Sequence, residues 1–211
     1  MFYENKLELN ISQQIYNNSN LLIYTRENKS YSTYKNLFNN VKLVPDIVLA
    51  NSLKVNYADI NNNHKILLLF RLDIEKKGDN IDKIKDMLTN NGYEYDESST
   101  MIDINDGIDL FKELNDFLAK ICSYNCIITD RLHAMIFSYL LNKKVAFNNF
   151  NDKIKSTYET WLSNSENILY LDNIIEKDIL MFLEKSETNI KEEEFSSQFE
   201  VLKNDLMGAH E

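Results

Sequence analysis

Short apolar runs alternate with helical patterns along most of the chain, and this alternation constrains the fold more than any other feature. The apolar runs predict strands at residues 21–26, 41–49, 65–71, 126–130, 144–149 and 167–171. Apolar residues at helical spacing predict helices at residues 28–39, 79–90, 107–121, 131–142, 151–162 and 173–185. Strands and helices in alternation are typical of an α/β fold with a doubly wound parallel sheet.

Composition excludes several classes of protein. A chain of 211 residues with 44% hydrophobic residues is long enough for one domain with a sizeable core, or for one domain and part of another. Its net charge of -10 argues against a general nucleic-acid-binding role, because phosphate neutralisation needs a basic surface. No apolar run reaches membrane-spanning length and no signal-peptide pattern is present, so we expect a cytoplasmic protein. Cys122 and Cys126 have no second pair of cysteines, which predicts neither a zinc site nor a disulfide framework.

Arginine is rare in this chain and occurs at equivalent positions. Only three of the 23 basic residues are arginines, and each closes an apolar run: Arg26 in "LLIYTR", Arg71 in "ILLLFR" and Arg131 in "CIITDR". The carboxyl ends of parallel strands share one edge of the sheet, where ligands bind in open α/β folds. Because a guanidinium group grips phosphate or carboxylate with two parallel hydrogen bonds, the pattern predicts an anion site at that edge.

A structural role for each arginine is the alternative, because nearby carboxylates such as Glu27, Asp73 and Glu75 offer ion-pair partners. The recurrence at three strand ends favours function for Arg71 and Arg131, and leaves open whether Arg26 joins them.

Polar residues crowd the joint between the run "CIIT" and the helix that follows it. His133 lies in the first predicted turn of that helix, where it would act as a general acid or as a hydrogen-bond donor to phosphate. The alternative is a buried histidine with a satisfied hydrogen bond. Asp130 is expected to be the N-cap of the helix. Lys153 and Tyr158, further along the chain, either reach the same edge or face solvent and the core.

These residues form a longer block that resembles a known family. "IITDRLHAMIFSYLLNKKVAFNNFNDKIKSTYETW" (127–161) is similar to the signature of the polysaccharide pyruvyl transferases. Residues 129–133 match it fully, whereas Asn148 stands where the family usually has Asp. The other matching positions are Asn149, Lys153, Ile154, Tyr158, Thr160 and Trp161. "LLLFRLDIE", "YTRENKSY" and "LVPDIVL" resemble upstream blocks, so that the resemblance spans about residues 20–175.

The resemblance implies a fold of two Rossmann-like domains that face each other across a cleft, as in GT-B glycosyltransferases. This chain resembles the C-terminal, donor-binding half of that fold. Residues 1–55 would be a remnant of the N-terminal domain, 56–185 the Rossmann-like donor-binding domain, and 186–211 an acidic tail or helix. The implied reaction transfers pyruvate from phosphoenolpyruvate to two hydroxyls of a sugar, as a ketal on a cell-surface polysaccharide. The implied partners are therefore phosphoenolpyruvate and a carbohydrate acceptor.

The resemblance also implies roles for particular residues. His133 and Arg131 would be catalytic. The implied substrate-binding residues are Arg71, Arg131, Leu132, His133, Asn149, Lys153 and Tyr158. In the expected mechanism His133 protonates the donor methylene, a sugar hydroxyl attacks, and two arginines stabilise the departing phosphate. No metal is expected, and no cofactor besides phosphoenolpyruvate as donor substrate.

The chain departs from the family in lacking the Gly-rich "GGGNxGD"-type block near the start, which by the resemblance would leave most of the acceptor half missing. A truncated member that binds the donor without transferring it, or one that pairs with another chain or with itself, is therefore also expected. Two other functions stay open at this point. One is a GT-B glycosyltransferase or sugar-nucleotide enzyme, and the other is a non-catalytic binding module.

Overall fold

The computed structural model describes residues 21–50, 63–70, 80–99, 109–148, 152–171, 176–185 and 195–208. The chain divides into two compact units. The first combines residues 1–50 with 156–161 and 194–211, and the second combines residues 51–155 with 162–193. None of the helices in the described part of the chain is long and apolar enough to cross a membrane.

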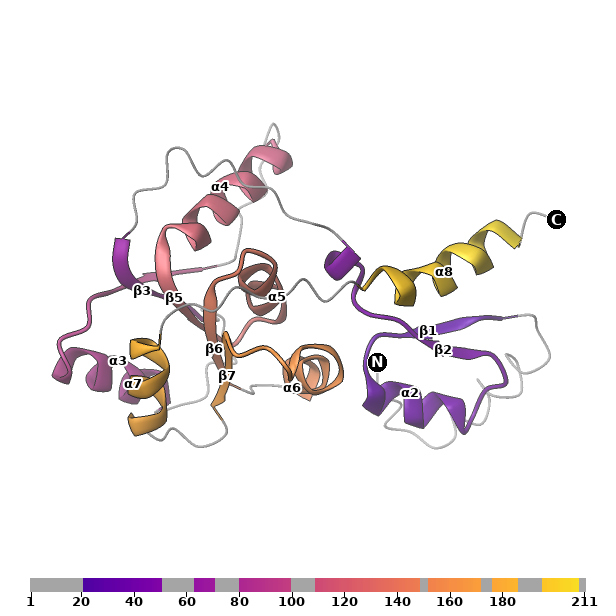
Figure 1. The fold of residues 1–211 in the computed structure, drawn as a ribbon, viewed down its shortest axis with the longest axis horizontal. Coiled ribbons are helices and arrows are strands. Elements are labelled where there is room, and N and C mark those ends of the chain that lie inside the picture. The colour runs from indigo at the N-terminus through magenta and orange to yellow at the C-terminus, as the bar shows by residue number, and fades with distance from the viewer. Residues whose placement is uncertain are drawn as a thin grey trace. The chain divides into compact units, whose positions relative to one another are not determined.

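A five-stranded parallel sheet forms the second unit (Figure 1). Its strands are β3 (Asn63–Leu69), β4 (Tyr95–Ser98), β5 (Tyr124–Thr129), β6 (Lys144–Asn148) and β7 (Ile168–Leu171). They lie in the order β4-β3-β5-β6-β7, and every neighbouring pair is parallel. The predicted Rossmann-like, doubly wound α/β fold is confirmed.

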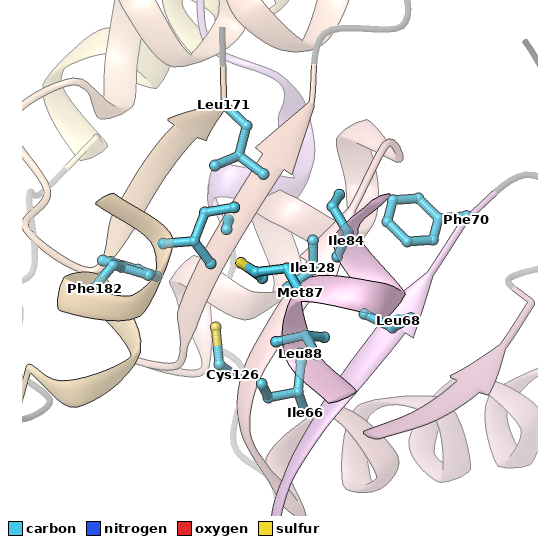
Figure 2. Close-up of a cluster of buried hydrophobic side chains, with 12 residues drawn as sticks. Ile66, Leu68, Phe70, Ile84, Met87, Leu88, Cys126, Ile128, Leu171 and Phe182 are labelled. Carbon is cyan, nitrogen blue, oxygen red and sulfur yellow. The ribbon is translucent and has the colours of Figure 1, made fainter. Parts of the chain in front are cut away.

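Helices cover both faces of this sheet. Alternate strand residues, among them Ile66, Leu68 and Ile128, pack with α3 (Asn80–Asn90) and α7 (Glu176–Glu184) in one buried cluster (Figure 2). The helices α4 (Leu110–Cys122) and α5 (Leu132–Leu140) both contact β5. Burial on both faces explains why the central strands read as nearly continuous apolar runs.

The order of the strands reverses between β3 and β5. The chain leaves β3 for β4 on one side, then returns past β3 to form β5, β6 and β7 on the other. In open α/β sheets the connections at such a reversal diverge to opposite faces, and they leave a crevice at the carboxyl ends of the two central strands. The topology thus marks the ends of β3 and β5 as the place to look for a ligand site.

The first unit is smaller. Its elements are β1 (Ile23–Thr25), α2 (Asn28–Lys35), β2 (Val41–Leu43), a 3-10 turn η1 (Ile47–Ala50), most of the π-helical turn η3 (Tyr158–Leu162) and α8 (Ser196–Gly208). β1 and β2 pair in parallel. The Asp205 carboxylate of α8 accepts hydrogen bonds from the Tyr24 hydroxyl at 2.7 Å and from Lys42 Nζ at 2.6 Å, which ties α8 to both strands.

Two predicted elements are corrected by the structure. The strand predicted at 41–49, which Pro45 is expected to break or to place at an edge, ends at Leu43, because Pro45 has no N–H for the ladder and Asp46 accepts a 3.2 Å hydrogen bond from the Val48 N–H to start a 3-10 turn. The predicted helix 151–162 is α-helical only over Asp152–Thr157 (α6), and continues as a π-helical turn.

The grouping of residues 156–161 and 194–211 with the N-terminal unit was not indicated by the sequence. The predicted domain limits at residues 55 and 185 remain predictions.

Candidate functional site

One hydroxyl group joins the ends of the two central strands to the helix that follows. Thr129, the last residue of β5, is fully buried and lies opposite Leu69, the last residue of β3. Its Oγ1 donates a 2.7 Å hydrogen bond to the Leu69 carbonyl and accepts a 3.0 Å hydrogen bond from the Arg131 N–H. The sequence singled out Thr129 only as part of a motif. The signal that could have identified its role is the i to i+2 hydrogen bond that Thr commonly makes at turns.

Arg131 is the N-cap of α5, in an extended conformation with φ -105° and ψ 124°. The prediction that Asp130 caps this helix is therefore wrong, and the N-cap side chain makes no capping hydrogen bond. The Asp130 carboxylate lies 3.8 Å from Arg131 Nε, which is an ion-pair distance but too long for a hydrogen bond. Within the described residues the buried Nε of Arg131 has no hydrogen-bond partner. The guanidinium group thus keeps donor capacity that an anion could use.

His133 lies in the first turn of α5, two residues after Arg131. Its side chain is exposed, so it is not the buried histidine considered as the alternative. Its ring centroid lies 6.3 Å from that of Phe137, one turn further along the helix. Leu132, between the two polar residues, is half-buried. The structure therefore brings Arg131, Leu132 and His133 together at the start of α5.

The remaining predicted site residues are placed differently. Lys153 is exposed in the first turn of α6 and belongs to the unit with the five-stranded sheet. Tyr158 begins the π-helical turn and belongs to the unit with β1 and β2. Burial, and then the charge of Glu159, raise the pKa of Tyr158, which favours a protonated hydroxyl that can donate a hydrogen bond. Arg71 and Asn149 lie outside the described residues.

Arg26 is paired with a carboxylate within its own unit. Its guanidinium donates a 2.9 Å hydrogen bond to the carboxylate of Asp46, which is only 7% exposed. This partner is not one of the carboxylates considered from the sequence. Asp46 lies 20 residues further along the chain than Arg26. The two arginines therefore differ. The Arg26 guanidinium lies within hydrogen-bonding distance of a buried carboxylate, whereas Arg131 Nε lies 3.8 Å from the Asp130 carboxylate.

The helix N-terminus next to Arg26 is closed by protein groups. Glu27, the N-cap of α2, accepts hydrogen bonds from the N–H groups of Lys29 at 2.8 Å and Ser30 at 2.9 Å. The N–H of Asn28 donates to Thr160 Oγ1 at 3.0 Å. Thr160, which matches the family block, thus contributes to this cap rather than to an open site.

The comparisons with known proteins agree with the resemblance found in the sequence. The family model for polysaccharide pyruvyl transferase matches residues 2–147, which is more than half of the chain and ends within the block 127–161. General stress protein 30 of Bacillus subtilis is 34% identical over 177 residues, which are 80% of this chain and 50% of that protein. The chain therefore spans about half the length of this relative.

A solved structure of an uncharacterized protein from Klebsiella pneumoniae has a similar fold. The TM-score is 0.54 at 21% sequence identity, and the match covers 76% of this chain and 59% of the other. At this level of identity the likeness concerns the fold alone.

Proposed function

Because this chain belongs to the polysaccharide pyruvyl transferase family, we propose that it binds phosphoenolpyruvate and takes part in transferring the pyruvyl group to two hydroxyls of a carbohydrate. In this reaction two C–O bonds form at C2 of the donor and its C–O bond to phosphate breaks. One hydroxyl proton goes to the methylene carbon, which becomes a methyl group, and the other goes to the departing phosphate. The products are a cyclic ketal and inorganic phosphate.

The observation that carries the proposal is the unsatisfied Nε of Arg131 at the reversal of the strand order. A buried guanidinium nitrogen without a hydrogen-bond partner is costly unless a ligand supplies one. The donor carries a phosphate and a carboxylate, and both groups match the planar fork of arginine. The exposed His133 lies in the adjacent turn, where it can approach a bound ligand as an acid or as a phosphate donor. The substrate-binding roles expected for Arg71, Asn149, Lys153 and Tyr158 remain predictions.

Calorimetry with phosphoenolpyruvate tests the proposal. Replacing Arg131 by Gln removes the charge and most of the donors, so we expect affinity to fall about ten- to hundredfold. Lys112→Gln is the matched control, because it removes the same charge from an exposed position on α4 of the same unit. Absence of any binding heat with the wild-type chain would refute the proposal.

A thermal-shift comparison separates this proposal from the glycosyltransferase alternative. A ligand that binds only the folded state raises the melting temperature. We expect phosphoenolpyruvate, and not UDP-glucose, to raise it in the wild-type chain. A shift with the nucleotide sugar alone would favour the sugar-nucleotide enzyme instead.

A further inference from the structure

We propose that Thr129 is the residue that positions Arg131 for ligand binding, an inference that rests on the proposed function. Thr129 is fully buried, so its side chain is not expected to touch a ligand. Its hydroxyl instead contacts two backbone groups at the reversal of the strand order, the Leu69 carbonyl at the end of β3 and the Arg131 N–H at the start of α5.

The direction of each hydrogen bond makes this contact specific. A hydroxyl has one hydrogen, and the Leu69 carbonyl accepts it. The lone pairs of Oγ1 therefore face the Arg131 N–H, and this bond holds the N-cap in its extended conformation. The direction in which the Arg131 side chain leaves the backbone follows from that conformation.

Among the described residues, the backbone of Arg131 has one other hydrogen bond, in which its carbonyl accepts from the Met135 N–H at 3.1 Å as part of the first turn of α5. The side chain of Arg131 makes no capping hydrogen bond of its own, and its ion-pair contact with Asp130 is 3.8 Å long. The described structure gives the guanidinium no hydrogen bond at Nε. The position of the side chain thus depends mainly on its backbone, whose N–H is held by Thr129 and whose carbonyl is held by the helix.

Two substitutions at Thr129 separate the effect of the hydroxyl group from the effect of the side chain's shape. Thr129→Val keeps the volume and branching but removes both hydrogen bonds, while Thr129→Ser keeps the hydroxyl and removes a methyl group. Ser138→Ala is the matched control for stability, because Ser138 is fully buried in α5 and its hydroxyl donates a 2.7 Å hydrogen bond to the Ala134 carbonyl away from the crevice.

Binding of phosphoenolpyruvate is measured by calorimetry on the full chain at a temperature where every variant is folded. We expect Thr129→Val to weaken binding at least about tenfold, Thr129→Ser to stay within about threefold of wild type, and Ser138→Ala to bind like wild type although it melts at a lower temperature. Wild-type affinity in Thr129→Val, or equal losses in the Val and Ser variants, would overturn the inference. If the Val variant does not fold, Thr129→Ala is measured in its place.

A second measurement needs no ligand. Hydrogen exchange of the Arg131 amide, followed by NMR, should be slow in wild type and Thr129→Ser, and at least about tenfold faster in Thr129→Val. Unchanged exchange would refute the positioning role whether or not the ligand binds. Faster exchange together with no binding by the wild-type chain would remove the proposed function and retain Thr129 as the residue that positions Arg131.

Discussion

The indole N–H of Trp161 donates a 2.8 Å hydrogen bond to the backbone carbonyl of Arg26, although 135 residues separate the two in the sequence. The Trp161 ring also contacts Phe195, edge to face, with 6.2 Å between centroids. Phe195 directly precedes α8 and is buried. A single side chain from the π-helical turn therefore joins the end of β1 to the C-terminal segment, and this explains why residues 156–161 belong to the same compact unit.

Replacing Trp161 by Phe should lower the free energy of unfolding by about 1 kcal/mol, because the variant keeps an aromatic ring but loses the hydrogen bond to Arg26. Urea unfolding followed by far-UV circular dichroism measures the change, since the chain has one Trp and its fluorescence is lost in the variant. Thr33→Ala, at an exposed position on α2, serves as the control and should change stability by less than about 0.5 kcal/mol. An unchanged urea midpoint in Trp161→Phe would show that water replaces the hydrogen bond of the indole with no loss of stability.

The tie between α8 and the β1–β2 pair should depend on pH in the acidic range. Hydrogen bonds from Lys42 and Tyr24 lower the pKa of the Asp205 carboxyl. A carboxyl whose pKa is lower in the folded state stabilises the fold above its unfolded pKa of about 4, and this contribution is lost as the pH falls through the folded pKa. Melting temperatures of wild type and Asp205→Asn should therefore differ near pH 7 and converge as the pH falls below about 4.

Glu200→Gln is the control for this experiment. Glu200 lies on the same helix and pairs with Lys203 at 3.4 Å, but both side chains are more than half exposed. Exposed pairs of this kind contribute little, so the variant should follow wild type at every pH. A difference in melting temperature between wild type and Asp205→Asn that stays constant down to about pH 2 would show that the charge of the Asp205 carboxylate does not stabilise the fold.

The hydrogen bond between Tyr24 and Asp205 also predicts a loss of stability in strong alkali. Burial, together with the hydrogen bond to Asp205, raises the pKa of Tyr24 to about 12. A group whose pKa is raised in the folded state stabilises the fold below its unfolded pKa of about 10, and this contribution is lost as the pH rises through about 12. Tyr24→Phe should remove the part of the alkaline transition that is due to this phenol, which ultraviolet titration of the tyrosines can detect.

The sequence predicts the strands best where burial is greatest. The run 65–71 corresponds to β3, in which Leu67 and Leu69 are fully buried, and apolar patterning is strongest at such positions. β4 (Tyr95–Ser98) shows no apolar run, because it is an edge strand with one neighbour and its sequence is polar and acidic. Local patterns therefore identify buried strands and fail at the sheet edge.

The candidate site was predictable only in part, for a similar reason. The run 129–133 is continuous in the sequence, so the proximity of Arg131 and His133 follows from local structure alone. The pairing of Arg26 with Asp46 and the cap that Thr160 provides to α2 depend on contacts between distant segments. No local pattern distinguishes Arg26 from Arg131, and only the tertiary structure shows that Arg26 is hydrogen-bonded to a carboxylate whereas Arg131 Nε lies 3.8 Å from one.

Lys144 should be a major determinant of stability. It is buried, and its Nζ donates hydrogen bonds to the carbonyls of Leu183 at 2.7 Å and Lys185 at 2.8 Å, at the C-terminal end of α7. A cation at this end of a helix satisfies orphan carbonyls and opposes the helix dipole. Lys144→Met should therefore cost about 2 kcal/mol in urea unfolding.

The matched control is Lys185→Met. The Lys185 ammonium pairs with Glu166 at 2.8 Å, but both side chains are largely exposed, at 46% and 63%. An exposed ion pair contributes at most about 1 kcal/mol. Equal losses in the two variants would indicate that the buried lysine does not serve as the cap of α7.

Thr157→Val should leave stability unchanged or increase it by up to about 1 kcal/mol. Thr157 is fully buried at the end of α6, and its hydroxyl has no hydrogen-bond partner among the described residues. Replacing an unsatisfied buried hydroxyl by a methyl group of similar size removes a desolvation cost. Thermal unfolding measures the effect, and a loss above about 1 kcal/mol would indicate that a water molecule satisfies this hydroxyl.

His133→Ala should lower turnover much more than stability. The side chain is exposed, so its removal should change the free energy of unfolding by less than about 0.5 kcal/mol. Loss of a general acid lowers rates by about 10²- to 10⁴-fold. The readout is phosphate release from phosphoenolpyruvate in the presence of a panel of glycosides, with Lys112→Gln as the control for an exposed substitution in the same unit.

His133→Gln distinguishes the two roles considered for this residue. Glutamine can donate a hydrogen bond to phosphate but cannot transfer a proton at neutral pH. If His133 protonates the donor methylene, the Gln variant should be as slow as the Ala variant. If His133 only binds phosphate, the Gln variant should recover most of the turnover, and the proton must then come from another group.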